Sequence, residues 1–135
     1  MPNRYLEGKR TVLWLAFLMG EQFLKTLKLD YLSLVRVEAH IRKNLITPLK
    51  ISDLSEVAGF NTTKLKRDFK KLYGTSIFKY ITALRMELAK NLITQDAVSI
   101  AQAAFEVGYA NPQHFTTAFK RNMGYLPSEL KSKVQ

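Results

Sequence analysis

Hydrophobic and polar positions follow the same pattern in two stretches of the chain, residues 51–74 and 100–124. Each stretch begins with apolar and small residues at helical spacing and reaches a glycine–aromatic pair, Gly59-Phe60 in the first and Gly108-Tyr109 in the second. An asparagine follows closely, and the helical spacing of apolar residues then resumes. Glycine readily takes the positive φ that ends a helix, and asparagine caps the start of the next one. Each stretch therefore predicts two helices joined by a tight turn, a helix-turn-helix motif.

The second helix of each motif has an apolar face and a polar face. At 100° per residue, Leu65, Phe69 and Leu72 fall together in the first motif, as do Phe115 and Phe119 in the second, and we expect both groups to be buried. The opposite face carries Thr63, Lys66, Arg67 and Lys70 in the first motif and Gln113, Thr116, Thr117 and Lys120 in the second. Such side chains reach base edges and phosphates from the major groove of DNA. A charged face is usually just solvated, and one motif alone leaves the choice even, but the repetition favours a binding face.

Helical periodicity also extends outside the two motifs. Residues 77–93 predict a long helix of roughly 25 Å, at 1.5 Å per residue, that acts as a rigid spacer between the motifs. Residues 30–45 predict another helix, with Asp30 or Ser33 as its N-cap, and a short last helix begins after Leu126. The positions of the 30–45 helix expected to face inward are Leu32, Leu34, Val35, Val37, Ala39 and Ile41.

Residues 4–29 predict a helix that is apolar almost all round, which is more than a surface helix needs. Its apolar run is far shorter than the roughly 20 residues that a membrane-spanning helix requires. We expect a second copy of the chain, or a domain absent from this sequence, to cover this surface. Packing against the chain's own domain is the alternative.

The expected fold is all-α, with two helix-turn-helix subdomains in a homeodomain-like tandem, joined by a long central helix and preceded by an apolar helix. The expected divisions are 1–29 for the N-terminal helix, 30–75 for the first subdomain, 76–95 for the central helix and 96–135 for the second subdomain. The N-terminal helix is interpreted as a remnant of, or link to, a sensing or dimerisation domain.

The charge of the chain narrows the choice of partner. Among 135 residues, 21 Lys and Arg face 11 Asp and Glu, which gives a net charge of +10 and favours a polyanion such as nucleic acid or an anionic membrane surface. There is no cysteine, and His40 and His114 have no clustered carboxylates or Gly-rich phosphate loop near them. We therefore expect no enzyme activity, no cofactor and no metal site. The absence of a signal peptide favours a cytoplasmic, nucleoid-associated protein.

From about Leu45 to Leu130 the chain resembles the DNA-binding region of the AraC/XylS family of bacterial transcription regulators. The matching residues are Gly59-Phe60, Leu65, Arg67, Phe69-Lys70-Lys71, Gly74, Ser76, Tyr80, Arg85-Met86, Ala89, Ile100-Ala101, Ala104, Gly108-Tyr109, Phe115, Ala118-Phe119-Lys120-Arg121, Gly124 and Pro127-Ser128. So many matches in order are more specific than one helix-turn-helix. The chain departs from the family pattern at Thr117, where many members carry Arg, and at Leu130-Lys131, where an aromatic residue and Arg are common.

The resemblance implies two recognition helices that enter successive major grooves of double-stranded DNA. The residues expected to contact bases are Thr63, Lys66, Arg67, Gln113, His114, Thr116 and Thr117. Those expected to contact phosphates are Lys64, Lys70, Lys71, Arg85, Lys120 and Arg121. For Arg85, an ion pair with Glu87 or simple solvation is the alternative. Without Arg at position 117, readout by the second motif is expected to be weaker or more degenerate.

The resemblance further implies activation through contact with RNA polymerase, and repression by occlusion of a promoter stays open. A homodimer through residues 5–29 is one way to cover the apolar helix, and no membrane partner is expected. The rival function is a non-enzymatic basic module that uses residues 11–27 to bind a membrane surface or another protein.

Overall fold

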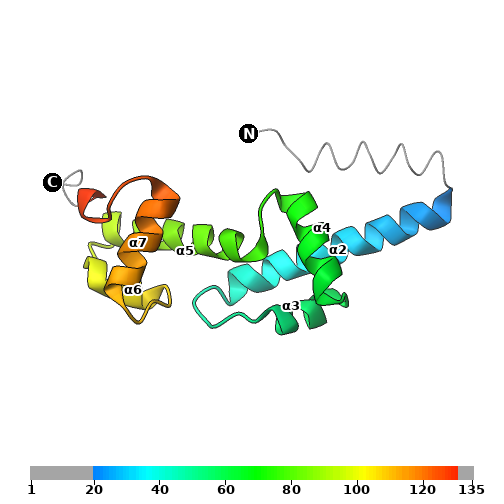
Figure 1. Cartoon of the computed structure of the whole chain (residues 1–135), viewed down its shortest axis with the longest axis horizontal. Coiled ribbons are helices and arrows are strands. Elements are labelled where there is room, and N and C mark those ends of the chain that lie inside the picture. Colours follow the sequence, from blue (N-terminus) through cyan, green and yellow to red (C-terminus); the bar gives the residue numbers. More distant parts are fainter. Residues whose placement is uncertain (1–19, 131–135) are drawn as a thin grey trace. The chain divides into compact units, whose positions relative to one another are not determined.

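The computed structural model describes residues 20–130, except for the side chains of residues 21–24 and 26. Within that range it is helical, and no strand is found there. The helices are α2 (Glu21–Lys43), α3 (Ile51–Ala58), α4 (Thr62–Tyr73), α5 (Ile77–Thr94), α6 (Ile100–Glu106) and α7 (Pro112–Met123) (Figure 1). The prediction of an all-α fold with paired helix-turn-helix motifs and a long helix between them is confirmed.

The chain forms two compact units. Unit 1 contains the described residues up to Lys43 together with Leu49–Ile77, and unit 2 contains Asn44–Pro48 and the described residues from Phe78 onward. Each unit pairs one long helix with one helix-turn-helix motif, and each has its own buried side chains.

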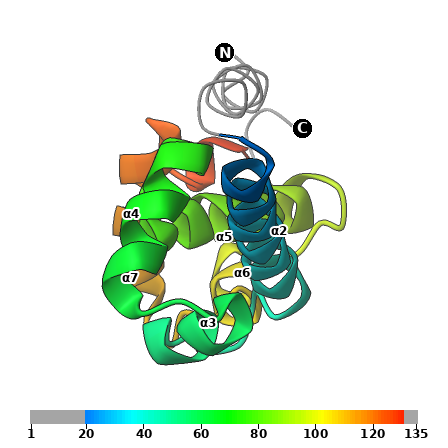
Figure 2. The ribbon, with the colours of Figure 1, turned by 90° about the vertical axis from the view of Figure 1, so that its right-hand side faces the viewer.

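Unit 1 is built on α2, which packs against both α3 and α4. Figure 2 shows these three helices around a common interior. The apolar side chains buried in this unit are Leu34, Val37, Ile41, Leu54, Ala58, Leu65, Phe69 and Ile77. The predicted burial of the apolar face of α4 is confirmed for Leu65 and Phe69, whereas Leu72 is half-buried.

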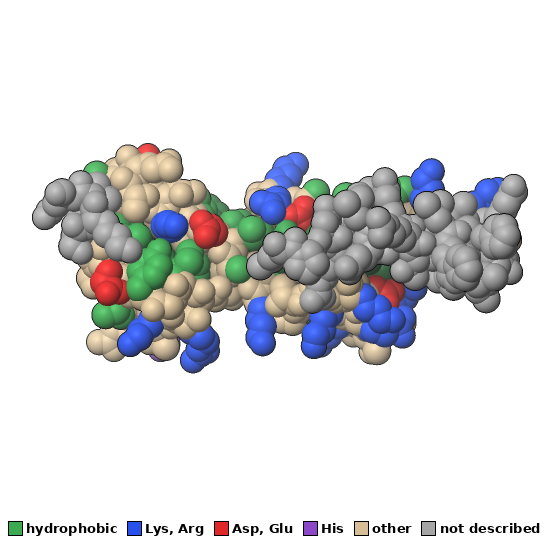
Figure 3. Space-filling model, turned by 90° about the horizontal axis from the view of Figure 1, so that it is seen from above, with side chains coloured by type: hydrophobic (Ala, Val, Ile, Leu, Met, Phe, Trp, Pro, Cys, Tyr) green, Lys and Arg blue, Asp and Glu red, His purple; other side chains and the backbone are tan. Residues whose placement is uncertain are grey.

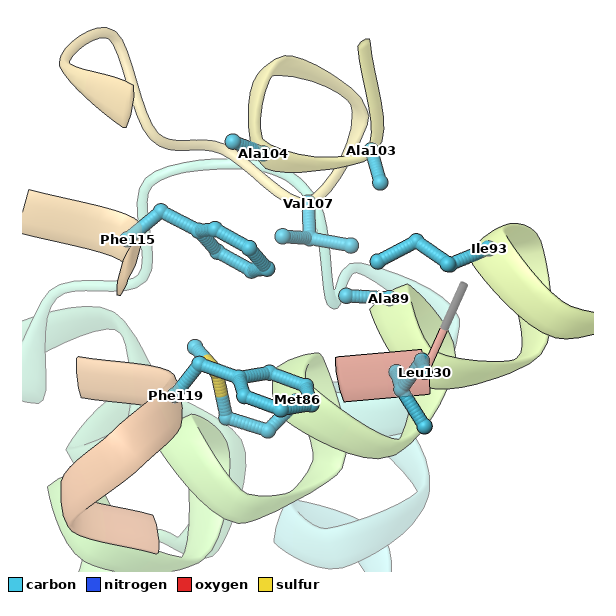
Figure 4. Close-up of a cluster of buried hydrophobic side chains, with 9 residues drawn as sticks. All are labelled: Met86, Ala89, Ile93, Ala103, Ala104, Val107, Phe115, Phe119 and Leu130. Atoms are coloured by element: carbon cyan, nitrogen blue, oxygen red, sulfur yellow. The ribbon is translucent and has the colours of Figure 1, made fainter. Parts of the chain in front are cut away.

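Unit 2 repeats the arrangement with α5 as its long helix. Figure 4 shows side chains of α5, α6 and α7 converging on one cluster, together with Leu130 from the turn after α7. The rings of Phe115 and Phe119 lie 5.7 Å apart, and both side chains are fully buried. The predicted apolar face of α7 is thus its buried face.

Helix α2 differs from the prediction for residues 30–45. It runs without a break from Glu21 to Lys43, so Asp30 and Ser33 lie inside it and neither is an N-cap. Ser33 is buried and accepts a hydrogen bond from Arg36, and Leu32 and Ala39 are exposed. The inward assignment of Leu32 and Ala39 was wrong, because at 100° per residue both lie on the side of the helix opposite the buried Leu34, Val37 and Ile41. Most of the N-terminal stretch 1–29, with its expected roles, lies outside the described residues.

A short segment of the chain, residues 44–48, connects α2 to unit 1's motif but belongs to unit 2. The guanidinium of Arg85 on α5 holds it, because Nε donates to the carbonyl oxygen of Leu45 at 2.8 Å and Nη2 donates to that of Thr47 at 3.0 Å. The carbonyl of Ile46, between those two, lies against Gly108. Unit 2 is therefore assembled from two separate stretches of sequence.

Candidate nucleic-acid interface

Helix α4 presents the predicted polar face of the first motif to the surface. Its start is capped by Asn61, whose side chain accepts a hydrogen bond from the Lys64 amide at 2.8 Å, and its end by Gly74 at φ 82°. With Leu65 and Phe69 buried, the opposite side of the helix must face outward. The exposed residues on it include Thr63, Lys66, Arg67, Lys70 and Lys71, all predicted to contact DNA.

Helix α7 presents the corresponding face of the second motif. Pro112 begins the helix, Asn111 accepts hydrogen bonds from the amides of Gln113 and His114, and Gly124 ends it at φ 86°. The exposed residues of the predicted set are Gln113, His114, Thr117, Lys120 and Arg121. Thr116 is half-buried, and its hydroxyl donates to the carbonyl oxygen of Pro112 at 3.0 Å.

The turns of the two motifs share a glycine conformation and a hydrogen-bond pattern. Gly59 has φ 73° and Gly108 has φ 96°, a conformation that side chains other than glycine's rarely adopt. The amide of the next residue then donates back into the first helix, from Phe60 to Ser55 and from Tyr109 to Ala104. The extra residue Ala110 lies between the second turn and the Asn111 cap, and each helix then begins after an asparagine.

Lys64 is engaged in an ion-pair network rather than projecting freely. Its Nζ lies 2.8 Å from a carboxylate oxygen of Asp30 on α2 and 3.4 Å from one of Asp68, and 4.7 Å from the centre of the Phe60 ring. The hydrogen bond with Asp30 is the main reason that the pKa of Lys64 is raised, and burial opposes it. Asp68 also accepts from Nε of Arg67 at 3.0 Å. Contact between Lys64 and a phosphate stays a prediction, and it would have to compete with these pairs.

Arg85 takes neither of the alternatives considered for it, an ion pair with Glu87 or simple solvation. Two of its nitrogens donate to the backbone of residues 44–48. Its charge also lies close enough to Tyr109 to oppose the rise in that residue's pKa, which burial causes. A phosphate contact by Arg85 stays a prediction, because the guanidinium already has a structural role.

The roles of Asp30 and Asp68 were missed by reasoning from the sequence. The spacing of Lys64 and Asp68 is a standard i, i+4 ion pair on a helix and could have been found. Asp30 is 34 positions away from Lys64, and only the packing of α2 against α4 brings the two together.

Positive charge is prominent on the molecular surface. On the face shown in Figure 3, Lys and Arg side chains stand out from the body of the protein, with acidic side chains scattered among them. Within residues 20–130, no helix is both long and apolar enough to cross a bilayer. The same residues contain no group of three or more His, Cys, Asp or Glu that could hold a metal ion.

Comparison with known proteins gives consistent matches. Residues 54–133 match a family described as a helix-turn-helix domain. The chain is 30% identical over 95 residues to the bifunctional transcriptional activator/DNA repair enzyme AdaA of Bacillus subtilis, covering 70% of this chain and 45% of that protein. It is 30% identical over 93 residues to the transcriptional regulator ExsA of Pseudomonas aeruginosa, covering 69% and 34% respectively. The chain thus spans less than half the length of these two curated relatives.

A solved structure extends the likeness to three dimensions. It is a transcriptional regulator from Chromobacterium violaceum described as containing an AraC-type DNA-binding domain, with a TM-score of 0.70 and 26% identity. The match covers 76% of this chain and 91% of that one.

Proposed function

This chain belongs to the AraC/XylS family of helix-turn-helix transcription regulators, and we propose on that basis that it binds double-stranded DNA sequence-specifically through α4 and α7. One observation carries the proposal. Two helices with equivalent caps bury an aromatic or aliphatic stripe and expose polar and basic side chains on the opposite side. A helix of this kind fits the major groove of B-form DNA, where base edges are distinguishable.

Electrostatic attraction provides the first step of binding. Lys70, Lys71, Lys120 and Arg121 are exposed in the last turns of α4 and α7, where they can neutralise phosphates and release counterions. This contribution is independent of sequence and falls as salt is raised. It fixes the register in which the other side chains meet the bases.

Direct readout provides the specificity. Arg67 is suited to donate two hydrogen bonds to guanine, and Gln113 to pair with adenine. Each such contact contributes roughly 1–3 kcal/mol of discrimination against the wrong base. Thr63, Lys66, His114, Thr116 and Thr117 complete the proposed base-contacting set.

Selection from a random-sequence duplex library, at two salt concentrations, tests the proposal. We expect an enriched motif in two halves, about 10 base pairs apart centre to centre, because successive major grooves recur about every 34 Å. A single enriched half would assign α7 mainly to backbone contacts. Binding without any enriched sequence, which disappears at moderate salt, would reject sequence-specific recognition.

We also propose a regulatory role for this chain from its family. We infer activation through contact with RNA polymerase, a non-catalytic role and a place in the bacterial cytoplasm on the nucleoid, all of which are typical of the family. A homodimer through residues 5–29 stays a proposal of the same kind, since most of that stretch lies outside the described residues. Reconstituted transcription with purified polymerase, with and without the chain, tests activation directly.

A further inference from the structure

Four charged side chains in unit 1 form a continuous network that ends at the proposed guanine-reading residue. Asp30 on α2 binds Nζ of Lys64 at 2.8 Å, and Lys64 lies 3.4 Å from one oxygen of Asp68. The other oxygen of Asp68 accepts from Nε of Arg67 at 3.0 Å. We call these residues the Asp30–Arg67 network.

Arg67 is the most exposed member of the network, and the three residues behind it are partly buried. The side chain of Arg67 is 57% exposed, whereas those of Lys64, Asp30 and Asp68 are 32%, 28% and 19% exposed. Asp68 is the least exposed of the four and touches two cations at once. It therefore links Arg67 to the more buried part of the network.

We propose that Asp68 is a positioning residue that determines base specificity by orienting Arg67, and that Asp30 supports it through Lys64. This inference rests on the proposed function of α4. Guanine offers two acceptors, N7 and O6, to a pair of parallel N–H groups. Because Nε of Arg67 is bound to Asp68, the pair that remains for guanine is the two terminal nitrogens at the end of the side chain.

Fixing Arg67 in this way also lowers the cost of binding. A free arginine loses much rotamer freedom when it is held against a base, and a side chain that is already held loses less. The network would thus orient the Arg67 guanidinium toward guanine and reduce the conformational entropy that Arg67 loses on binding.

A purely electrostatic role for Asp68 and a positioning role predict opposite changes in DNA affinity when Asp68 is removed. A carboxylate beside the DNA-facing side of α4 repels phosphates, so its removal alone should strengthen binding to every duplex. A positioning role predicts that its removal weakens binding to the preferred sequence and lowers the preference for guanine. The two explanations therefore differ in the sign of the effect.

The test compares Asp68→Ala, Asp68→Glu, Arg67→Ala and the double variant in the full chain, against duplexes that differ only at the guanine read by Arg67. We expect Asp68→Ala to reduce the preference for guanine roughly tenfold, within the range of one bidentate contact. In the Arg67→Ala background the same change should have no effect on base preference, and Asp68→Glu should restore part of it. Asp30→Ala should give a smaller reduction, of about two- to threefold.

Glu56→Gln is the matched control, because it removes an exposed acid of α3 that lies outside the network. Equal strengthening of binding on all duplexes by Asp68→Ala and Glu56→Gln would overturn the inference in favour of simple repulsion. Uniform weakening by Asp68→Ala, with unfolding at lower urea, would overturn it in favour of a structural role. A guanine preference that Arg67→Ala removes and Asp68→Ala leaves intact would reject this inference alone, whereas no sequence preference in the unmodified chain would reject the proposed function itself.

Discussion

The helix-turn-helix motifs of units 1 and 2 share a framework but differ in what their second helices expose. Both have an asparagine cap, a buried pair of large apolar side chains and a left-handed glycine at the end. Basic residues at the end of each helix also correspond, since Lys70-Lys71 in α4 is matched by Lys120-Arg121 in α7. In the first turns the helices diverge, because α4 carries Lys66 and Arg67 where α7 carries Thr116 and Thr117. The parts that hold the helix and its proposed phosphate contacts are repeated, and the proposed base-reading part is not.

The largest expected effect is on stability, and it tests whether units 1 and 2 unfold independently of each other. Phe69→Ala and Phe119→Ala each remove a fully buried ring, so each should cost about 3–5 kcal/mol of unfolding free energy. Amide hydrogen exchange should accelerate mainly in unit 1 for the first variant and in unit 2 for the second. Phe105→Ala, at a 71% exposed position, should change stability by no more than about 0.5 kcal/mol. Equal acceleration in both units by either variant would show that they unfold as one block.

The next effect tests the divergence in readout. Arg67→Ala should cost roughly 1–3 kcal/mol of discrimination at one base pair, and Thr117→Ala about 1 kcal/mol or less, because a hydroxyl makes at most a neutral hydrogen bond. Thr117→Arg should add a base preference in the second half of the DNA site, so that the two halves are read with more similar specificity. Competition binding against duplexes varied one position at a time measures all three. Equal losses for Arg67→Ala and Thr117→Ala would remove the proposed difference between the helices.

The two turns offer a third comparison. Alanine at Gly59 or Gly108 must adopt a left-handed conformation, which costs about 1–2 kcal/mol. The cost should be larger at Gly108, where an added Cβ would lie 3.4 Å from the carbonyl oxygen of Ile46, than at Gly59, where nothing lies within 4 Å. Urea unfolding measures the difference, and Gly59→Asn is the control because asparagine tolerates this conformation. A smaller loss at Gly108 would mean that the segment around Ile46 yields easily.

The N-caps of α3 and α6 differ, and the expected effect on the free energy of unfolding is smaller. Ser99 caps α6 by accepting from the amide of Gln102, whereas Lys50 makes no side-chain cap for α3. Ser99→Ala should destabilise unit 2 by about 1 kcal/mol, and Lys50→Ser should stabilise unit 1 by about 0.5–1 kcal/mol. Hydrogen exchange of the first-turn amides resolves the two effects. Destabilisation by Lys50→Ser would show that lysine contributes there in some other way.

The smallest effect concerns pH. Because Asp30 raises the pKa of Lys64 above its ordinary value of 10.5, the pair stabilises the fold below that pH and loses its contribution as pH rises through the folded-state pKa. The stability difference between the unmodified chain and Asp30→Asn should therefore be constant from pH 7 to about 10 and shrink as the pH rises past 10.5. The corresponding residue of α7 is His114, which is exposed. A difference that stays constant to the highest pH measured would contradict the pairing.

Reasoning from the sequence predicted both motifs, because they depend on local signals such as Gly59, Asn61 and the spacing of Leu65 and Phe69. It also predicted most of the exposed residues of α4 and α7 from helical periodicity, but Lys64 and Thr116 are half-buried. It could not predict that Asp30 pairs with Lys64 or that Arg85 binds residues 44–48. Those contacts join positions far apart in sequence, and they form only when long helices pack in a particular register.

Residues 44–48 have a consequence for how the chain can be divided. They precede the first motif, yet Arg85 of the long helix that follows that motif holds them. As the chain is synthesised, this segment emerges first and acquires its hydrogen-bond partner only after the whole of α3 and α4 has followed. A recombination joint or protease cut at the start of α5 would leave the second unit without part of its own structure. The two units alternate along the sequence, so neither a single cut nor the exchange of one continuous segment separates them.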